Sequence, residues 1–271
     1  MPVLRSARPC EELRSYVRAY AYRKFELTDL AVVEPVPAQL EQVLNFELGV
    51  LPGVWHRSVE MSREAWIGGA QTIFPGYMQL GPGVESFAIF FQPAGWSSLF
   101  AIPMSQFTNR IHDATSVMGH CMRALWNRLG ESSSFEHRVR IAEEFLRQRV
   151  PGAINESRIA AAATRLFQHH GAIRVSSLAQ QDLMGLRQFE RLFRRETGAS
   201  PKVFARVARF QAALDAKLAS RERTWLDIAH SFGYYDQMHM IHDFESLGSN
   251  SPKYLIAQMG DVRPPALASA T

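Results

Sequence analysis

A weak internal repeat in the C-terminal part of this 271-residue sequence constrains its fold more than any other feature. The segment 175–201 holds two apolar stretches of helical period separated by a turn of about four residues, and the segment 225–252 repeats that order. Pro201 and Pro252 are 51 residues apart, as are two equivalent phenylalanines. A short helix, a tight turn and a second helix have the proportions of a helix-turn-helix unit. The sequence therefore predicts two such units.

Each unit has its own buried and exposed faces. Small residues, Ala179 and Ala229, stand where the first helix must approach the second. Apolar pairs at i, i+4 are expected to hold each second helix against its core. These pairs are Phe189 with Phe193 in the first unit and Met240 with Phe244 in the second. The opposite faces then carry Arg187, Glu190, Arg191 and Arg194 in the first unit, and Gln237, Met238, His239 and His242 in the second.

A single helix from Pro201 to about Ala219 is predicted to join the two units. Proline is well placed in the first turn of a helix. The expected buried stripe consists of Val203, Val207, Phe210, Leu214 and Leu218. Nineteen helical residues span roughly 28 Å, close to the ~34 Å between successive turns of one major groove. One chain is thus expected to place two recognition helices in adjacent major-groove segments.

The net positive charge of the chain comes entirely from this C-terminal part. The net charge is +4, and the residues from 155 onward hold 15 Lys and Arg against 11 Asp and Glu, which accounts for all of it. Within Leu186–Arg209 the local excess is +5. Such a concentration favours a polyanionic partner such as double-stranded DNA. The charge alone is equally compatible with an ordinary solvated helix face.

The first 112 residues have a β-rich pattern. Apolar and β-branched runs are separated by turns containing Pro and Gly, which is typical of an antiparallel sandwich or barrel. The expected strands are 31–35, 42–48, 54–59, 65–67, 77–80 and 85–92. The segment 11–25 fits a helix or a strand equally well. Two helical stripes follow at 117–129 and 139–146, and we expect them to pack on the β-rich domain, with a dimer seam as the alternative.

Together these patterns predict an α+β, two-domain chain. The run Arg149–Gly152 contains Pro and Gly and ends the helical pattern before it. We expect a β-rich regulatory domain at 1–150, used for effector binding, dimerisation or both. An all-α domain at 154–260 and a flexible tail at 261–271 complete the chain.

Residues 154–259 resemble the AraC/XylS family of bacterial transcription regulators. Two runs carry the resemblance: 192–201, LFRRETGASP, and 228–240, IAHSFGYYDQMHM. The layout of the N-terminal part also resembles the β-rich sensor-like domains that precede this DNA-binding domain in many members. The resemblance implies a cytoplasmic, sequence-specific transcription regulator that is not an enzyme and needs no cofactor. It also implies double-stranded DNA and RNA polymerase as partners, with a small effector and a second copy of the chain as further candidates.

The resemblance also assigns roles to residues. It implies base contacts from Arg187, Glu190, Arg191, Met238 and His242. It implies phosphate contacts from Gln188, Gln237 and His239, and the basic side chains Arg194, Arg195 and Lys202 suit the same role. For the effector, the candidate pocket aromatics are Trp55, Trp66, Phe74, Tyr77, Phe90 and Trp96.

Three positions depart from the family pattern. Gly185 stands where a capping residue such as Ser is usual, and Gly248 comes one position early, with Ser249 in the usual place of glycine. His242 replaces a more basic side chain. The second unit is therefore expected to position the protein more than to read sequence.

Other classes of protein lack their signatures here. The two cysteines, Cys10 and Cys121, cannot supply the zinc cluster and reactive thiol of the DNA-repair methyltransferases that carry a related helical domain. No G-x-S-x-G, P-loop or G-x-G-x-x-G motif occurs. His56 and His112 do not form a metal-binding cluster in the sequence, and no apolar run is long enough to span a membrane. The alternative function is a small-molecule-binding protein whose helical domain is a protein-interaction module.

Overall fold

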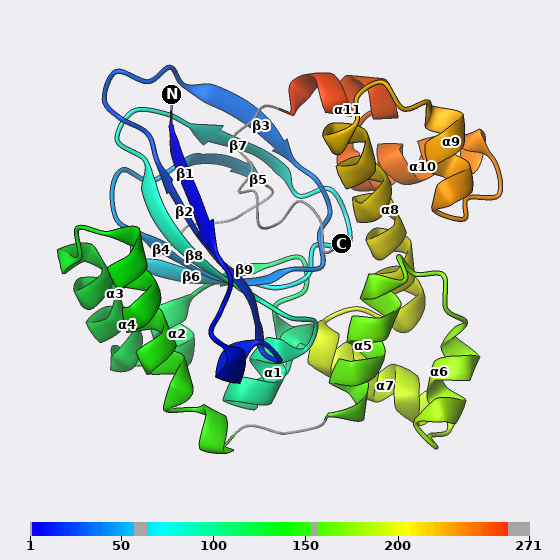
Figure 1. Cartoon of the computed structure of the whole chain (residues 1–271), viewed down its shortest axis with the longest axis horizontal. Coiled ribbons are helices and arrows are strands. Elements are labelled where there is room, and N and C mark those ends of the chain that lie inside the picture. The colour runs from blue at the N-terminus through cyan, green and yellow to red at the C-terminus, as the bar shows by residue number, and fades with distance from the viewer. Residues whose placement is uncertain (1, 57–63, 153–156, 260–271) are drawn as a thin grey trace.

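The computed structural model describes residues 2–56, 64–152 and 157–259, which form a β-rich part and a helical part side by side (Figure 1). The β-rich part begins with a six-stranded antiparallel sheet in the order β1-β2-β8-β4-β6-β9. Its strands are β1 (Val3–Ala7), β2 (Val17–Lys24), β8 (Glu85–Phe91), β4 (Gln42–Glu47), β6 (Ala65–Gly68) and β9 (Ile111–Asp113).

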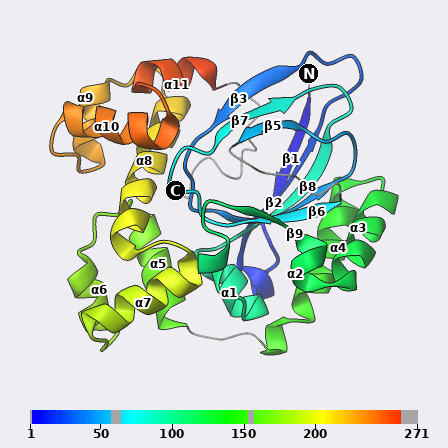
Figure 2. The ribbon, with the colours of Figure 1, turned by 180° about the vertical axis from the view of Figure 1, so that it is seen from behind.

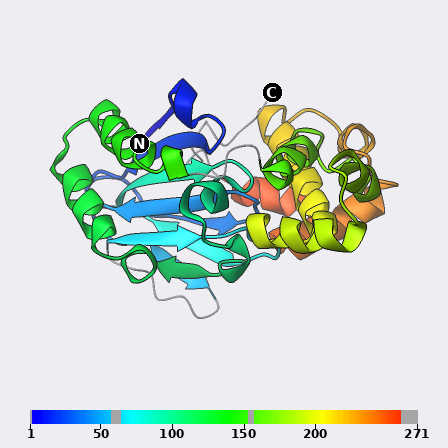
Figure 3. The same cartoon turned by 90° about the horizontal axis from the view of Figure 1, so that it is seen from below.

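A smaller antiparallel sheet faces the first one. Its order is β3-β7-β5, with β3 (Val32–Val36), β7 (Gly76–Leu80) and β5 (Gly53–His56). Every residue of β4 is buried, because one face of this strand looks toward the smaller sheet and the other toward a layer of helices. The predicted antiparallel sandwich is therefore confirmed (Figure 3).

Helices cover the outer face of the six-stranded sheet. Side chains such as Tyr20, Phe46 and Phe87 pack with Leu125 and Leu146 in one core, so the two helical stripes pack on the sheet as expected. The covering elements are α1 (Gly95–Phe100), α2 (Ala114–Met118), α3 (His120–Glu131) and α4 (Phe135–Arg147), with short 3-10 turns at Glu11–Leu13, Met104–Gln106 and Val150–Gly152.

The remaining described residues form the helical part. Its helices are α5 (Arg158–Gln168), α6 (Val175–Gln181), α7 (Leu186–Thr197), α8 (Pro201–Ala219), α9 (Trp225–Ser231), α10 (Gln237–Gly248) and α11 (Pro252–Gln258). α8 runs through the middle, with α5–α7 at one end and α9–α11 at the other (Figure 2). Their core includes Ala38, Leu40 and Ala70 from the β-rich part, so the two parts share an apolar interface.

One sequence prediction needs correction, and one open alternative is decided. Val203 was expected in the buried stripe of α8 but is 36% exposed, and Phe204 is buried in its place. The buried face of α8 is wider than a single stripe, because the β-rich part covers a second side that includes Gln211. The ambiguous segment 11–25 is a 3-10 turn followed by strand β2.

Some predictions concern residues that the structure does not describe. The tail at 261–271 and the end of the strand predicted at 54–59 lie there, and so does most of the junction between the two predicted domains. The domain limits therefore stay a prediction.

Candidate DNA-binding surface and the adjoining cavity

The first helix-turn-helix unit consists of α6 and α7. Phe189 and Phe193 of α7 are fully buried, with ring centroids 5.6 Å apart, and Ala179 of α6 is 1% exposed. Gly185 directly precedes α7 at the N-cap position, and it offers no side-chain cap for the free N–H groups of the first turn. Those N–H groups remain available to an external acceptor such as a phosphate oxygen.

The outward face of α7 is basic. All of its predicted DNA-contact residues are exposed: Arg187, Gln188, Glu190, Arg191, Arg194 and Arg195. Within the part of the chain that the structure describes, Arg187, Arg191 and Arg194 form no ion pair. Their guanidinium groups are thus free to donate to base edges and phosphates. Lys202, at the start of α8, is also exposed.

The second unit consists of α9 and α10 and presents a nearly neutral face. Thr224 and Asp236 cap the two helices, accepting from the Asp227 and His239 N–H groups at 3.1 and 2.7 Å. Met240 and Phe244 are fully buried. The predicted contact residues Gln237, Met238, His239 and His242 are all exposed. His242 Nδ1 lies 3.7 Å from Glu245, an ion pair only when the imidazole is protonated.

One exposed side chain at this surface was missed from the sequence. Tyr235 is 91% exposed and directly precedes the cap of α10. The second turn has one residue more than the first, since α6 and α9 begin 50 residues apart whereas α7 and α10 begin 51 apart. This extra residue in the second turn is the signal from which the exposure of Tyr235 could have been predicted.

Linker helix α8 uses part of the basic run for internal contacts. The Nε atom of Arg206 donates to Asp243 Oδ1 of α10 at 2.6 Å, and the Arg209 guanidinium lies over the Tyr234 ring. Burial raises the pKa of Tyr234, and the nearby Asp243 carboxylate raises it further. The +5 charge of Leu186–Arg209 is therefore not wholly available to DNA.

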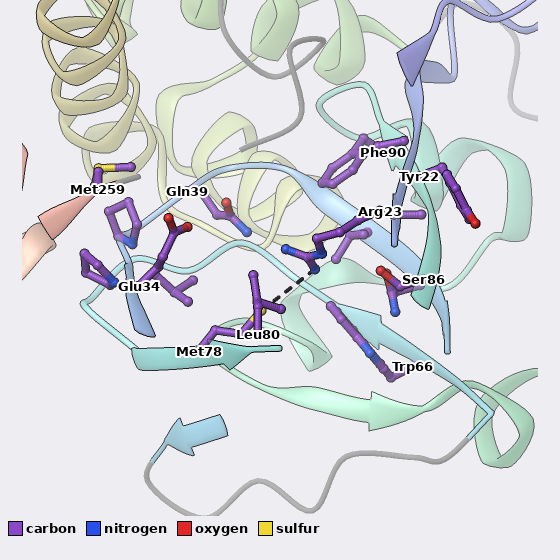
Figure 4. Close-up of a pocket in the computed structure, with 17 residues that line it drawn as sticks. Tyr22, Arg23, Glu34, Gln39, Trp66, Met78, Leu80, Ser86, Phe90 and Met259 are labelled. Carbon is purple, nitrogen blue, oxygen red and sulfur yellow. Dashed lines mark hydrogen bonds between the residues drawn. The ribbon is translucent and has the colours of Figure 1, made fainter. Parts of the chain in front are cut away.

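A cavity of about 150 Å³ lies between the two sheets of the β-rich part, and Met259, which follows α11, also lines it (Figure 4). A second lobe of about 80 Å³ shares Val43, Trp66 and Met78 with it. The lining is mostly apolar. Exceptions include Arg23, Glu34 and Asn45. Such a concave apolar space with a few polar groups is typical of small-molecule sites.

Arg23 is the cationic residue that lines the cavity. Its Nη2 atom donates to Met78 Sδ at 3.9 Å, and its buried Nε has no hydrogen-bond partner among the described residues. Burial lowers the pKa of Arg23, while the carboxylates of Glu47 and Glu34 act in the opposite direction. Arg23 was not among the residues predicted from the sequence to line an effector pocket. No local signal distinguished it, because strand β2 also contains the basic residues Arg18 and Lys24.

Glu47 lies behind the wall of the cavity. Its Oε1 atom accepts from Asn45 Nδ2 and Trp66 Nε1, both at 2.8 Å, and the residue is 2% exposed. Burial raises the pKa of its carboxyl group, which these two hydrogen bonds and the charge of Arg23 partly offset. Glu47 therefore fixes Trp66 and Asn45, two residues that line the cavity.

The predicted pocket aromatics are divided among three places. Trp66, Tyr77 and Phe90 line one or both lobes. Phe74 packs edge-on against Tyr77. Trp96 is fully buried on the other side of the sheet, against Phe91 and Phe100. Trp55 pairs with Tyr77 in the strand register, and its side chain lies outside the description.

Residues 2–56, 64–152 and 157–259 contain neither a metal-binding cluster nor a membrane-spanning helix. No three His, Cys, Asp or Glu side chains gather there as a metal ion would require. None of the helices there is both long and apolar enough to cross a bilayer.

The helical part matches a known protein family. Residues 178–257 match a family described as a helix-turn-helix domain, of the AraC type. None of the curated proteins matches the sequence.

Several solved structures are similar in fold. An apo single-residue variant of ToxT from Vibrio cholerae has 7% identity and a TM-score of 0.50, covering 89% of this chain and 98% of that one. Wild-type ToxT bound to an unsaturated fatty acid has 8% identity and a TM-score of 0.47, covering 87% and 97%. The AraC-like transcriptional activator CuxR has 12% identity and a TM-score of 0.21, covering 74% and 83%. The last two superpose too loosely to support an argument.

These findings define the class of the domain. Residues 178–257 form an AraC-type helix-turn-helix domain, and the chain as a whole shares the two-part fold of ToxT. The resemblance to the AraC/XylS family is thereby confirmed for residues 178–257.

Proposed function

We propose that this chain is a sequence-specific transcription regulator that inserts α7 and α10 into successive major-groove segments of one DNA face. The observation that carries the proposal is the pair of helix-turn-helix units at the two ends of the 19-residue helix α8, with an exposed basic face on α7. A helix in the major groove reads base edges through side-chain hydrogen bonds.

The residue roles are those that the resemblance to the AraC/XylS family implies, with further basic side chains added as phosphate contacts, and the exposure of all these side chains supports them. Arg187, Glu190 and Arg191 read bases from α7, and Met238 and His242 contact bases from α10. Phosphate contacts come from Gln188, Arg194, Arg195, Lys202, Gln237 and His239. Because the face of α10 is nearly neutral, the first unit supplies most of the sequence preference and the second mainly positions the protein.

Selection of the full chain on a random duplex pool at near-physiological salt tests this proposal. We expect enrichment of a bipartite motif with centres about 10 base pairs apart. Weak, sequence-blind binding would contradict it and favour the alternative, a small-molecule-binding protein whose helical domain contacts other proteins.

We also propose that the β-rich domain, 1–150, regulates the helical domain, 154–260, through a small effector in the cavity. RNA polymerase and a second copy of the chain are the proposed protein partners, and the regulator acts in the cytoplasm. An apolar cavity of about 150 Å³ holds a ligand of about one aromatic ring. The unpartnered Arg23 Nε favours a ligand with an anionic or hydrogen-bond-accepting group.

Calorimetry with compact ring carboxylates, each paired with its neutral amide, tests the effector proposal. We expect the carboxylate to bind more tightly in each pair, and Arg23→Met to remove that preference. Arg5→Met, an exposed residue of β1, is the matched control. Equal binding of acid and amide would exclude a role for Arg23 in recognition.

A further inference from the structure

The segment 37–42, which runs from the end of β3 to the first residue of β4, contacts both the cavity and the helical part. Pro37 and Gln39 line the cavity. Ala38 and Leu40 point the other way and lie in the core of the helical part, 0% and 2% exposed. This alternation follows from an extended backbone, in which successive side chains point to opposite sides.

The same segment holds the carboxyl end of α10. The Ala38 N–H donates to the Leu247 carbonyl oxygen at 2.8 Å. Leu247 is the penultimate residue of α10, so its carbonyl is among the last four, which have no partner within the helix. The β-rich part supplies that partner.

The carboxyl end of α7 is held in the same way. Ser97 Oγ donates to the Glu196 carbonyl at 3.0 Å, and Thr108 Oγ1 donates to the Gly198 carbonyl at 2.5 Å. Gln42 Nε2 lies 3.5 Å from the carbonyls of Glu196 and Thr197. Both recognition helices therefore end on hydrogen-bond donors of the β-rich part.

Linker helix α8 is fixed between these two points. Gln211, 4% exposed, accepts from the Leu40 N–H at 3.0 Å and donates to Glu41 Oε2 at 2.7 Å. Arg18 Nη1 holds the other oxygen of Glu41 at 2.5 Å. All three helices that place the two units thus contact one stretch of five residues, 38–42.

We propose that segment 38–42, together with Ser97 and Thr108, sets the separation between the two recognition helices and so the half-site spacing accepted on DNA. Four residue steps reach at most roughly 14 Å, which leaves little slack between the attachment of α10 and that of α7. The sandwich thereby contributes to specificity through residues that do not touch DNA. This inference rests on the proposed DNA-binding function.

The test uses duplexes that carry the selected half-sites at centre spacings of about 8 to 13 base pairs. The full chain is expected to prefer one spacing over its neighbours by tenfold or more in affinity. The variant Ser97→Ala/Thr108→Val removes two hydroxyl donors without adding bulk and is expected to reduce that preference to threefold or less. Gln211→Leu is expected to act in the same direction.

Ser98→Ala is the matched control, because the Ser98 hydroxyl is buried on the same helix but forms no bond to α7 within the described residues. Affinity for a duplex with only the first half-site should change less than twofold in every variant. If the double variant and Gln211→Leu both keep the spacing preference of the unaltered chain, this inference is overturned, while the proposed DNA-binding function stands. Absence of sequence preference in the unaltered chain would overturn the proposed function and the inference with it.

Discussion

Two equivalent residues, 51 positions apart, end the two recognition helices in the left-handed conformation. Gly198 ends α7 with φ +89°, and Ser249 ends α10 with φ +67°. A β-carbon disfavours this conformation by roughly 1–2 kcal/mol, which glycine avoids. The early Gly248 serves another purpose, because a β-carbon there would lie 2.5 Å from Leu255 Cδ2.

The variant Ser249→Gly is therefore expected to stabilise the protein by about 0.5–1 kcal/mol. The reciprocal variant, Gly198→Ser, should destabilise it by more, because its β-carbon would also meet Thr108 Oγ1 at 2.9 Å. Urea denaturation of both variants gives the comparison. A loss of stability in Ser249→Gly would show that the serine side chain makes a compensating contact.

Arg191 offers the most direct test of base recognition in the DNA. Arg191→Ala is expected to cost about 1–3 kcal/mol on the selected site and to relax the preference for one base pair. Arg140→Ala, an exposed arginine of α4 far from the helix-turn-helix units, should have no effect. An equal loss on specific and random duplexes would reassign Arg191 to a phosphate contact.

Glu47 makes stability depend on pH. Because burial raises the pKa of its carboxyl group above the ordinary 4.5, the folded protein holds this proton at a pH where the unfolded chain has lost it. Its contribution to the free energy of unfolding therefore falls as pH rises above about 4.5. Glu47→Gln should remove that fall while Glu131→Gln, an exposed change on α3, keeps it. Identical pH profiles for the wild type and Glu47→Gln in urea denaturation would contradict the assignment.

At the scale of elements, α8 and α10 are joined by an asymmetric ion pair. The Asp243 side chain is 5% exposed, whereas that of Arg206 is 43% exposed. Removing arginine leaves a buried carboxylate without its cation, and removing aspartate leaves a cation that can reach water. Replacing Arg206 by alanine and replacing Asp243 by alanine should therefore lower the free energy of unfolding by different amounts.

Arg206→Ala is expected to lower the free energy of unfolding by about 2–3 kcal/mol and Asp243→Ala by about 1 kcal/mol. Chemical denaturation of both single variants and the double variant separates the pair energy from the cost of burial. Equal losses in the two single variants would show that Asp243 remains accessible to water.

The sequence predicted elements well where the period of apolar residues was regular. The limits of α8 agree with the predicted helix, and the strand predicted at 42–48 differs from β4 by one residue. Strands β1 and β9 were missed, because Val3–Ala7 mixes polar and apolar residues at a sheet edge and Ile111–Asp113 is only three residues long. Helix α1 was missed because the Pro and Gly before it indicate a turn.

The site was less predictable than the fold. Local patterns identified the exposed faces of α7 and α10, since a helix period determines which residues point outward. The cavity depends on which strands pair and which face of each strand looks inward, so Trp96 and Trp66 could not be assigned to opposite sides of the sheet. The contacts of segment 38–42 join residues more than 150 positions apart, which no local pattern predicts.

At the scale of the whole molecule, affinity for DNA should depend on salt. Arg194, Arg195 and Lys202 are the cationic phosphate contacts proposed, so log K against log salt is expected to have a slope of about −3 or steeper. Arg194→Ala should reduce the magnitude of the slope by about 1 and weaken all sequences alike. Fluorescence anisotropy titrations across a range of salt concentrations provide the measurement. A slope near zero would exclude phosphate neutralisation by these residues.

The shared interface between the two parts has a consequence for how such a chain can evolve by recombination. Because Ala38, Leu40 and Ala70 complete the helical core, a helical domain grafted behind an unrelated partner would expose apolar surface and unsatisfied carbonyl groups. A successful exchange must carry segment 38–42 along with the helices, or evolve a replacement for it. Inheritance of the DNA-binding domain is therefore tied to a short stretch of sequence more than 100 residues away from it.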